Sequence, residues 1–251
     1  MTVVGVLHPG EMGSAVAAAL RERGAPVLWA SAGRSGATTE RAVAARLEDV
    51  GEVGELCRRC DVLLSICPPH AALDVAEQAS GFRGIYVDAN AIAPKTARAV
   101  AGMHERFVDG GIVGPPPLEP GITRLYLSGG EAKHVAALFA GTNVDARAIS
   151  DEPGAASALK AAYAGWTKGS AALLLTVREL ARAEGVEEAL LAEWQLSLPE
   201  LEERVAGGER SARRKGWRWI GEMEEISLAM VDQDLPGGFH EAAAEVFRRH
   251  S

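Results

Sequence analysis

The sequence predicts an α/β protein: a doubly wound sheet, then an all-helical C-terminal domain, with one long helix joining the two. Up to about residue 150, short apolar and β-branched runs alternate with helix-forming runs. From residue 155 the chain is rich in Ala, Leu, Glu and Arg at helical spacing. One helical pattern continues from about residue 153 to Gly185, which would give a helix of about 45 Å. We therefore expect two domains, 1–150 and 151–251.

The strands and helices of the first domain are predicted from apolar runs and from the residues that interrupt them. Strands are expected at residues 2–7, 26–30, 61–66, 84–88, 106–109, 122–128 and 144–149. Helices are expected at 14–23, 37–47, 70–79, 94–104 and 131–140. Gly24 stops the first helix, and Pro94 stands at a helix start. Such alternation predicts a parallel sheet with right-handed crossovers.

A glycine turn joins the first strand to the first helix. Its sequence is His8-Pro9-Gly10-Glu11-Met12-Gly13. The free N–H groups and the dipole of a helix N-terminus bind a pyrophosphate, and glycine lets the phosphate approach the backbone. Gly10 and Gly13 match the last two glycines of G-x-G-x-x-G, but His8 replaces the first, and Pro9 is expected to hold the turn. The turn predicts a Rossmann-like dinucleotide site, and an ordinary strand–helix turn without a ligand is the alternative.

The end of the second strand favours one nicotinamide cofactor over the other. NAD sites usually place an acid there to hold the ribose 2′-hydroxyl. Residues 29–36 contain no acid and offer Ser31, Arg34 and Ser35. A guanidinium with hydroxyl groups suits a 2′-phosphate. We therefore expect NADP(H) rather than NAD(H), and a solvated loop arginine is the alternative for Arg34.

Composition and cysteine spacing limit the other possibilities. The chain has 251 residues and a net charge of −8, which disfavours nucleic acid as a partner. It has neither a signal-peptide pattern nor an apolar run long enough to span a bilayer, so a cytoplasmic protein is expected. Cys57, Cys60, Cys67 and His70 have zinc-like spacing, but a strand between Cys60 and Cys67 would hold those two about 20 Å apart. No metal site is therefore expected.

Several segments resemble a known family. Met12-Gly13 matches its glycine turn, and residues 88–94 (DANAIAP) match a segment after its fourth strand. Residues 109–115 (DGGIVGP) match its substrate loop, and 154–160 (GAASALK) match the helix start that carries its catalytic lysine. The chain resembles the β-hydroxyacid dehydrogenase family, which includes 6-phosphogluconate and 3-hydroxyisobutyrate dehydrogenases. Residues 216–228 look closest to a poorly characterised bacterial branch with a distinct C-terminal helical domain.

The resemblance implies roles for particular residues. Lys160 would be the general acid/base, with its pKa lowered by desolvation in a closed site, and a solvated helix lysine is the alternative. Asn90 would bond the nicotinamide carboxamide or the substrate, and turn capping is its alternative. Other expected contacts are Cys67, Pro68 and Pro69 along the cofactor ribose, and Gly111, Ile112, Val113 and Gly114 in the substrate loop.

The long helix offers further candidates, and the chain departs from the family pattern in several places. Tyr163 follows Lys160 at i+3, and Tyr163 or Thr167 could orient the substrate; core packing is the alternative for Tyr163. Val113 replaces a serine that anchors a substrate carboxylate, and Ala164 replaces an asparagine. Glu224-Glu225 stands in place of a Lys-Asp pair. These departures favour a neutral or cationic small-molecule substrate.

Together these features predict an NADP(H)-dependent oxidoreductase that reduces a small carbonyl compound or oxidises the alcohol. Imine reduction on the same scaffold and a non-catalytic NADP(H)-binding protein are the alternatives. The helical domain is thin and places several tryptophans among its apolar positions. It is therefore expected to form a homodimer in which helices bury each other's faces.

Overall fold

The computed structural model describes residues 1–250, apart from the side chains of residues 214 and 215. These residues form two compact units, which divide after Lys160. The division falls inside the long helix α7 (Ala155–Ala183), so the first turn of α7 belongs to the first unit.

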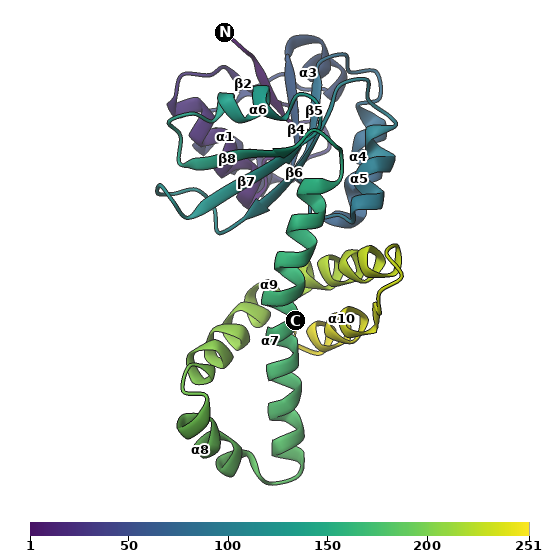
Figure 1. Ribbon diagram of the computed structural model, residues 1–251. Coiled ribbons are helices and arrows are strands. Elements are labelled where there is room, and N and C mark those ends of the chain that lie inside the picture. Colours follow the sequence, from purple (N-terminus) through teal and green to yellow (C-terminus); the bar gives the residue numbers. More distant parts are fainter. Residues whose placement is uncertain (251) are drawn as a thin grey trace. The chain divides into compact units, whose positions relative to one another are not determined.

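The first unit is built on one eight-stranded sheet (Figure 1). Its order is β3-β2-β1-β4-β5-β6-β7-β8. All neighbours are parallel except β6 and β7, which are antiparallel because no helix crosses over between them. The strands are β1 (Val4–Val6), β2 (Val27–Trp29), β3 (Glu48–Asp49), β4 (Val62–Ser65), β5 (Ile85–Asp88), β6 (Phe107–Val113), β7 (Thr123–Ser128) and β8 (Val144–Ser150).

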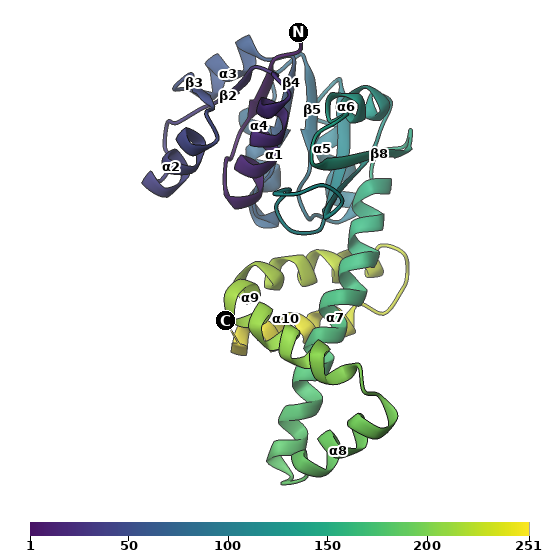
Figure 2. The same ribbon diagram turned by 90° about the vertical axis from the view of Figure 1, so that its left-hand side faces the viewer.

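Helices cover both faces of this sheet, which confirms the predicted fold class (Figures 1 and 2). One face packs against α1 (Glu11–Glu22), α2 (Gly36–Ala44) and α6 (Ala132–Leu138). The other packs against α3 (Val53–Arg59), α4 (Ala72–Gln78) and α5 (Pro94–Ala101), with a short 3-10 turn, η1 (Pro69–Ala71), before α4.

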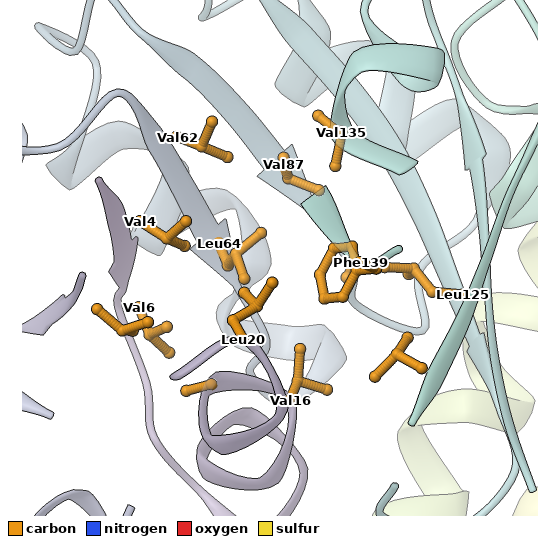
Figure 3. Packing of buried hydrophobic residues seen from close by; sticks show 14 of the residues in the cluster. Val4, Val6, Val16, Leu20, Val62, Leu64, Val87, Leu125, Val135 and Phe139 are labelled. Carbon is orange, nitrogen blue, oxygen red and sulfur yellow. The ribbon is translucent and has the colours of Figure 1, made fainter. Parts of the chain in front are cut away.

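Alternate strand residues supply the two cores. Val4 and Val6 of β1 lie in the same cluster as Val16 and Leu20 of α1, as Figure 3 shows. Leu63 of β4 points to the opposite face, among the residues of the second cluster. Because both faces are buried, the central strands are continuous apolar runs, which made them recognisable in the sequence.

Three features of the first unit differ from the sequence prediction. The edge strand β3 and the helix α3 were not predicted. Glu48 and Asp49, which form β3, are both exposed and show no apolar pattern. The strand expected at 106–109 continues to Val113, so the expected substrate loop is largely strand. Pairing with β7 holds Gly110 and Gly111 extended although glycine disfavours strands.

The second unit contains helices only, within the part of the chain that the structure describes. It comprises α7 from residue 161, α8 (Glu187–Ser197), α9 (Leu201–Val231) and α10 (Gly238–His250). Its core joins α7, α9 and α10 through Ala161, Ala164, Ala172, Leu175, Ala212, Met223, Ile226, Ala243, Ala244 and Phe247. Trp219 stacks edge-on against Phe247, whereas Trp217 is exposed. Of the helices described, none is long and apolar enough to cross a membrane.

Gly13 is the position where the fold most directly requires a glycine in the turn. A Cβ on Gly13 would lie 2.3 Å from the His8 carbonyl oxygen, closer than any real contact. We expect Gly13→Ala to lower the free energy of unfolding by about 1–3 kcal/mol, because backbone must move. Urea denaturation would measure this change.

Gly36 provides the matched control, since it also lies in the first turn of a helix but its Cβ would meet nothing within 4 Å. Gly36→Ala should be neutral or stabilising by up to about 1 kcal/mol. Equal effects of the two substitutions would contradict the steric account of Gly13.

Candidate functional site

The predicted cofactor residues gather at one edge of the sheet. His8, Arg34, Cys67 and Asn90 follow the ends of β1, β2, β4 and β5. These strands are parallel, so their carboxyl ends lie on the same side. Ligands of open α/β sheets bind outside this edge.

The turn after β1 is shaped to receive a phosphate. Gly10 is the N-cap of α1 and has extended backbone and no side-chain cap. A Cβ built on Gly10 would meet nothing within 4 Å, so the space in front of the helix N-terminus is open. Of the neighbouring candidates, Pro9 is buried, Glu11 is exposed and Met12 packs against the core. The backbone here fits a dinucleotide pyrophosphate.

His8 contacts Arg34 directly, which the sequence did not reveal. Nε2 of His8 lies against Nη1 of Arg34, across 26 positions of the chain. Burial, and then the neighbouring guanidinium, lower the pKa of His8 to about 4. The imidazole is therefore neutral near pH 7, and Nε2 can accept a hydrogen bond from the arginine.

The other residues expected at the ribose have local partners. Ser35 is the N-cap of α2 and accepts a hydrogen bond from the Thr38 N–H at 3.3 Å. Ser31 donates hydrogen bonds to Asp49 at the end of β3, which also accepts one from the Gly51 N–H at 2.8 Å. Asp49 was not predicted at the site, because the short edge strand β3 that carries it is exposed and has no apolar pattern.

The side chain of Asn90 forms hydrogen bonds to neighbouring residues of the protein. Its Nδ2 donates to Ser65 Oγ at 3.1 Å and to Asp88 Oδ2 at 2.9 Å, while its Oδ1 accepts from the Cys67 N–H at 2.5 Å. Its side chain is 3% exposed. Because both amide donors are occupied, the geometry favours the capping role over the catalytic and cofactor-binding roles expected from the sequence. Asn90 ties the ends of β4 and β5 together.

The loop after β4 contributes shape rather than a reactive thiol. Burial, and then the charge of Asp88, raise the pKa of the Cys67 thiol to about 12. The thiol therefore stays protonated at neutral pH and does not act as a nucleophile. Pro68 is exposed and Pro69 begins η1.

Two buried carboxylates lie side by side where β5 and β6 pair. Asp88 is directly opposite Asp109 in the parallel register, and both are fully buried. Burial raises the pKa of Asp88 to about 7; hydrogen bonds from Asn90 oppose the rise, and the charge of Asp109 adds to it. Two adjacent charges in a buried site are unfavourable, so Asp88 is partly protonated near pH 7.

Asp109 fixes the start of α7. Its Oδ2 accepts from the Gly154 N–H at 3.0 Å, the Ser157 N–H at 2.9 Å and Ser128 Oγ at 2.9 Å, and its Oδ1 accepts from Ser157 Oγ at 2.5 Å. A carboxylate at a helix N-terminus also interacts favourably with the helix dipole. The first turn of α7, which leads to Lys160, is thereby held on the sheet.

Lys160 lies against β6 beyond the end of β5. A Cβ on Gly111 would be 2.8 Å from the Ala156 carbonyl oxygen and 3.0 Å from the Lys160 Cβ. Gly111 lies past the Asp88–Asp109 pair, at the carboxyl edge. The missing side chain of Gly111 lets α7 approach the strand and brings Lys160 to the edge that carries the glycine turn.

The remaining substrate candidates do not share one environment. Ile112 belongs to the core cluster and Val113 is 3% exposed, which corrects the loop expected at these positions. Gly114 follows the strand with φ of +115°, a conformation that favours glycine. Tyr163 and Thr167 lie in the second unit and are exposed, and Thr167 Oγ1 donates to the Tyr163 carbonyl at 3.0 Å. Their roles toward a substrate stay predictions.

Two acids of the second unit, Glu222 and Glu224, are paired with bases. Lys168 forms an ion pair with Glu222 in which both side chains are mostly buried, and its ammonium lies 5.6 Å from the Trp219 ring centroid. Glu224, half of the acidic pair noted in the sequence, is paired with Arg248. The ion pair with Arg248 therefore partly neutralises the negative charge of Glu224.

Comparison with known proteins agrees with this architecture. Residues 181–250 match the family model described as a domain of unknown function (DUF1932). The chain is 28% identical to an uncharacterised 28.5 kDa protein of Methanothermus fervidus over 234 residues, 90% of this chain and 91% of that one. Among solved structures, the conserved protein MTH1747, of unknown function and described as similar to 3-hydroxyacid dehydrogenases, is 30% identical with a TM-score of 0.75, covering 98% and 96% of the two chains.

More distant structures share the fold alone. A Mycobacterium tuberculosis 3-hydroxyisobutyrate dehydrogenase has a TM-score of 0.72 at 14% identity, covering 99% of this chain and 93% of that one. A reductive aminase from Aspergillus terreus has a TM-score of 0.62 at 18% identity, with the same coverage. The fold is thus of the type described for 3-hydroxyacid dehydrogenases. The chain belongs to the β-hydroxyacid dehydrogenase-like family.

The raised pKa of Asp88 predicts a specific pH dependence of stability. Its ordinary pKa of 3.8 applies to the unfolded chain, and the folded value is about 7. Between these values the folded protein holds a proton that the unfolded chain releases. We expect this group to lower the free energy of unfolding as pH rises from about 4 to 7, by up to about 1.4 kcal/mol per pH unit.

Urea denaturation across this range, compared between wild type and Asp88→Asn, isolates the contribution. His8 acts in the opposite direction below pH 6.5, because its pKa is lowered on folding, but it is present in both proteins and cancels. A difference curve that is flat between pH 4 and 7 would show that Asp88 titrates normally.

Proposed function

We propose that this protein is an NADP(H)-dependent oxidoreductase that interconverts a small carbonyl compound and its alcohol, with Lys160 as general acid/base. The observation that carries the proposal is the close approach of Gly111 to Ala156 and Lys160, at the same edge of the sheet as the open glycine turn. A lysine and a phosphate-binding helix end share the edge where α/β folds bind their ligands.

The cofactor preference rests on charge. Arg34 follows β2 and contacts His8, so a guanidinium stands where the 2′-position of the adenosine ribose is expected. A guanidinium binds a phosphate monoester through paired hydrogen bonds. Asp49 lies nearby, but hydrogen bonds from Ser31 and Gly51 occupy it. These contacts support NADP(H) over NAD(H).

In the proposed mechanism the protein's residues orient the reactants and move one proton. A bound nicotinamide supplies or accepts the hydride. Backbone N–H groups at the start of α1 hold the pyrophosphate. Lys160 donates a proton to the carbonyl oxygen as hydride reaches the carbon, and removes it in the reverse direction. We further propose that Tyr163, three residues on along α7, or Thr167 orients the substrate.

The substrate is expected to be neutral or cationic. Val113 stands where relatives of this type place a carboxylate-anchoring serine, and its side chain is buried, so it offers no anchor. Imine reduction is the second candidate, because reductive aminases share the fold. The lysine favours carbonyl chemistry, because the carbonyl oxygen develops negative charge as hydride reaches the carbon and must receive a proton, whereas the nitrogen of a protonated imine already carries one.

Lys160→Ala tests the assignment. We expect kcat for NADPH consumption with a panel of small aldehydes, ketones and cyclic imines to fall by about 10²–10⁴-fold, because proton transfer is lost. NADPH affinity, followed by tryptophan fluorescence, should be unchanged. Lys133→Ala on the exposed side of α6 is the matched control and should retain full turnover.

Unchanged turnover in Lys160→Ala would remove the lysine from the mechanism. Retained turnover confined to the imines would select the second candidate. Tight NADPH binding without turnover on any compound of the panel would instead favour a cofactor-binding protein that is not an enzyme.

We also propose that the second unit forms a homodimer. A groove of about 580 Å³ lies between α7 and α10 in this unit, and its largest side chains are exposed, among them Phe239 at 81% and Trp166 at 67%. Among the described residues that line it there is no carboxylate, lysine or arginine. A chain of net charge −8 repels its own copies, so a contact between copies is most favourable at such an uncharged apolar surface.

Phe239→Glu tests this surface. We expect the wild type to be a dimer in size-exclusion chromatography with light scattering, and Phe239→Glu to be a monomer, because a charge would be buried in the contact. Leu196→Glu is the control: Leu196 is 83% exposed on α8, outside the groove. A wild-type monomer at micromolar concentration would contradict the proposal.

A further inference from the structure

The contact between His8 and Arg34 leaves two buried donors without partners. When His8 Nε2 accepts from Arg34 Nη1, the proton of the neutral ring is on Nδ1. His8 Nδ1 and Arg34 Nε are both buried, and neither has a hydrogen-bond partner among the described residues. Unpaired buried donors are costly, and an acceptor group that meets both removes the cost.

The chemistry of these donors indicates the class of ligand. Both belong to side chains that are in direct contact through His8 Nε2 and Arg34 Nη1. A phosphate monoester offers three acceptor oxygens and negative charge, whereas a ribose hydroxyl offers one weaker acceptor. Cys67, the group that acts on Arg34 electrostatically, is a protonated thiol at neutral pH and therefore does not compete with a phosphate for the guanidinium.

We propose that His8 is a positioning and specificity-determining residue, which holds Arg34 in place and with it forms a binding site for the 2′-phosphate of the adenosine half of the cofactor. This inference rests on the proposed function and assigns His8 a role within that site. An arginine side chain loses rotamer entropy when it binds a ligand, and an acceptor that already holds the side chain in place reduces the loss that remains on binding.

The same geometry explains how the turn works without its first glycine. The side chain of His8 is directed to the end of β2, while the space before Gly10 stays open. The backbone carbonyl of His8 accepts from the Gly10 N–H at 2.8 Å, which closes the turn. The histidine therefore leaves the space for the pyrophosphate open, and it places its side chain where the ribose of the adenosine half is expected.

Binding of 2′,5′-ADP and of 5′-AMP to the full-length protein by calorimetry tests the proposal, since the two probes differ by the 2′-phosphate. His8→Gly, which restores the glycine of the motif, should weaken 2′,5′-ADP about tenfold or more and leave 5′-AMP within about twofold. His8→Gln keeps an acceptor and a donor and should recover most of the affinity. Arg34→Ala should remove the discrimination between the probes.

His134→Gln, an exposed histidine on α6, is the control for histidine replacement and should bind both probes normally. An unchanged or improved affinity of His8→Gly for 2′,5′-ADP would overturn the role of His8, and improvement would mean that the ring blocks the site. Failure of the wild type to bind 2′,5′-ADP, NADPH or NADH would overturn the proposed function itself. Wild-type preference for NADPH that His8→Gly retains would overturn this inference alone.

Discussion

The carboxylate of Asp109 joins the sheet of the first unit to the first turn of α7. It is fully buried and has four hydrogen-bond donors, three of them from residues 154–157. A buried charge is tolerated only when such donors replace its water, and the helix N-terminus supplies both donors and a favourable dipole. The placement of Lys160 depends on this cap, because Lys160 follows Ser157 by less than one helical turn.

The charge on Asp109 has a consequence for its neighbour. Asp88 lies opposite it across the β5–β6 pair, and burial already disfavours ionisation there. Asn90 donates hydrogen bonds to Asp88, which stabilise the ionised form of that carboxyl group. The side-chain oxygen of Asn90 also accepts a hydrogen bond from the Cys67 N–H. Hydrogen bonds of Asn90 thus connect the ends of β4 and β5, and those of Asp109 connect β6 to β7 and to the start of α7. These polar side chains are occupied by hydrogen bonds within the protein, which hold the strand ends together.

The two ends of the carboxyl edge have different chemistry. At β1 and β2, His8 and Arg34 present nitrogen donors suited to an anion. At β6, Lys160 stands beside a strand in which the side chains of Ile112 and Val113 are both buried. Positive charge is thus available to a phosphate at one end, and a single proton-transfer group is available at the other. Such a division suits a large anionic cofactor and a small substrate without its own carboxylate.

The sequence by itself determined the features that depend on local pattern. Apolar runs, helix stops and the glycine turn predicted the central strands, the helices between them and the long α7, because periodicity and turn chemistry act over a few residues. Tertiary structure decided the rest. Asp109 meets residues 45 and 48 positions away, and His8 meets Arg34 26 positions away, contacts that no local pattern encodes. Only pairing with β7 turned the Gly110-Gly111 segment into strand, and only the surrounding donors gave Asn90 a structural place, since long-range hydrogen bonds override local propensity.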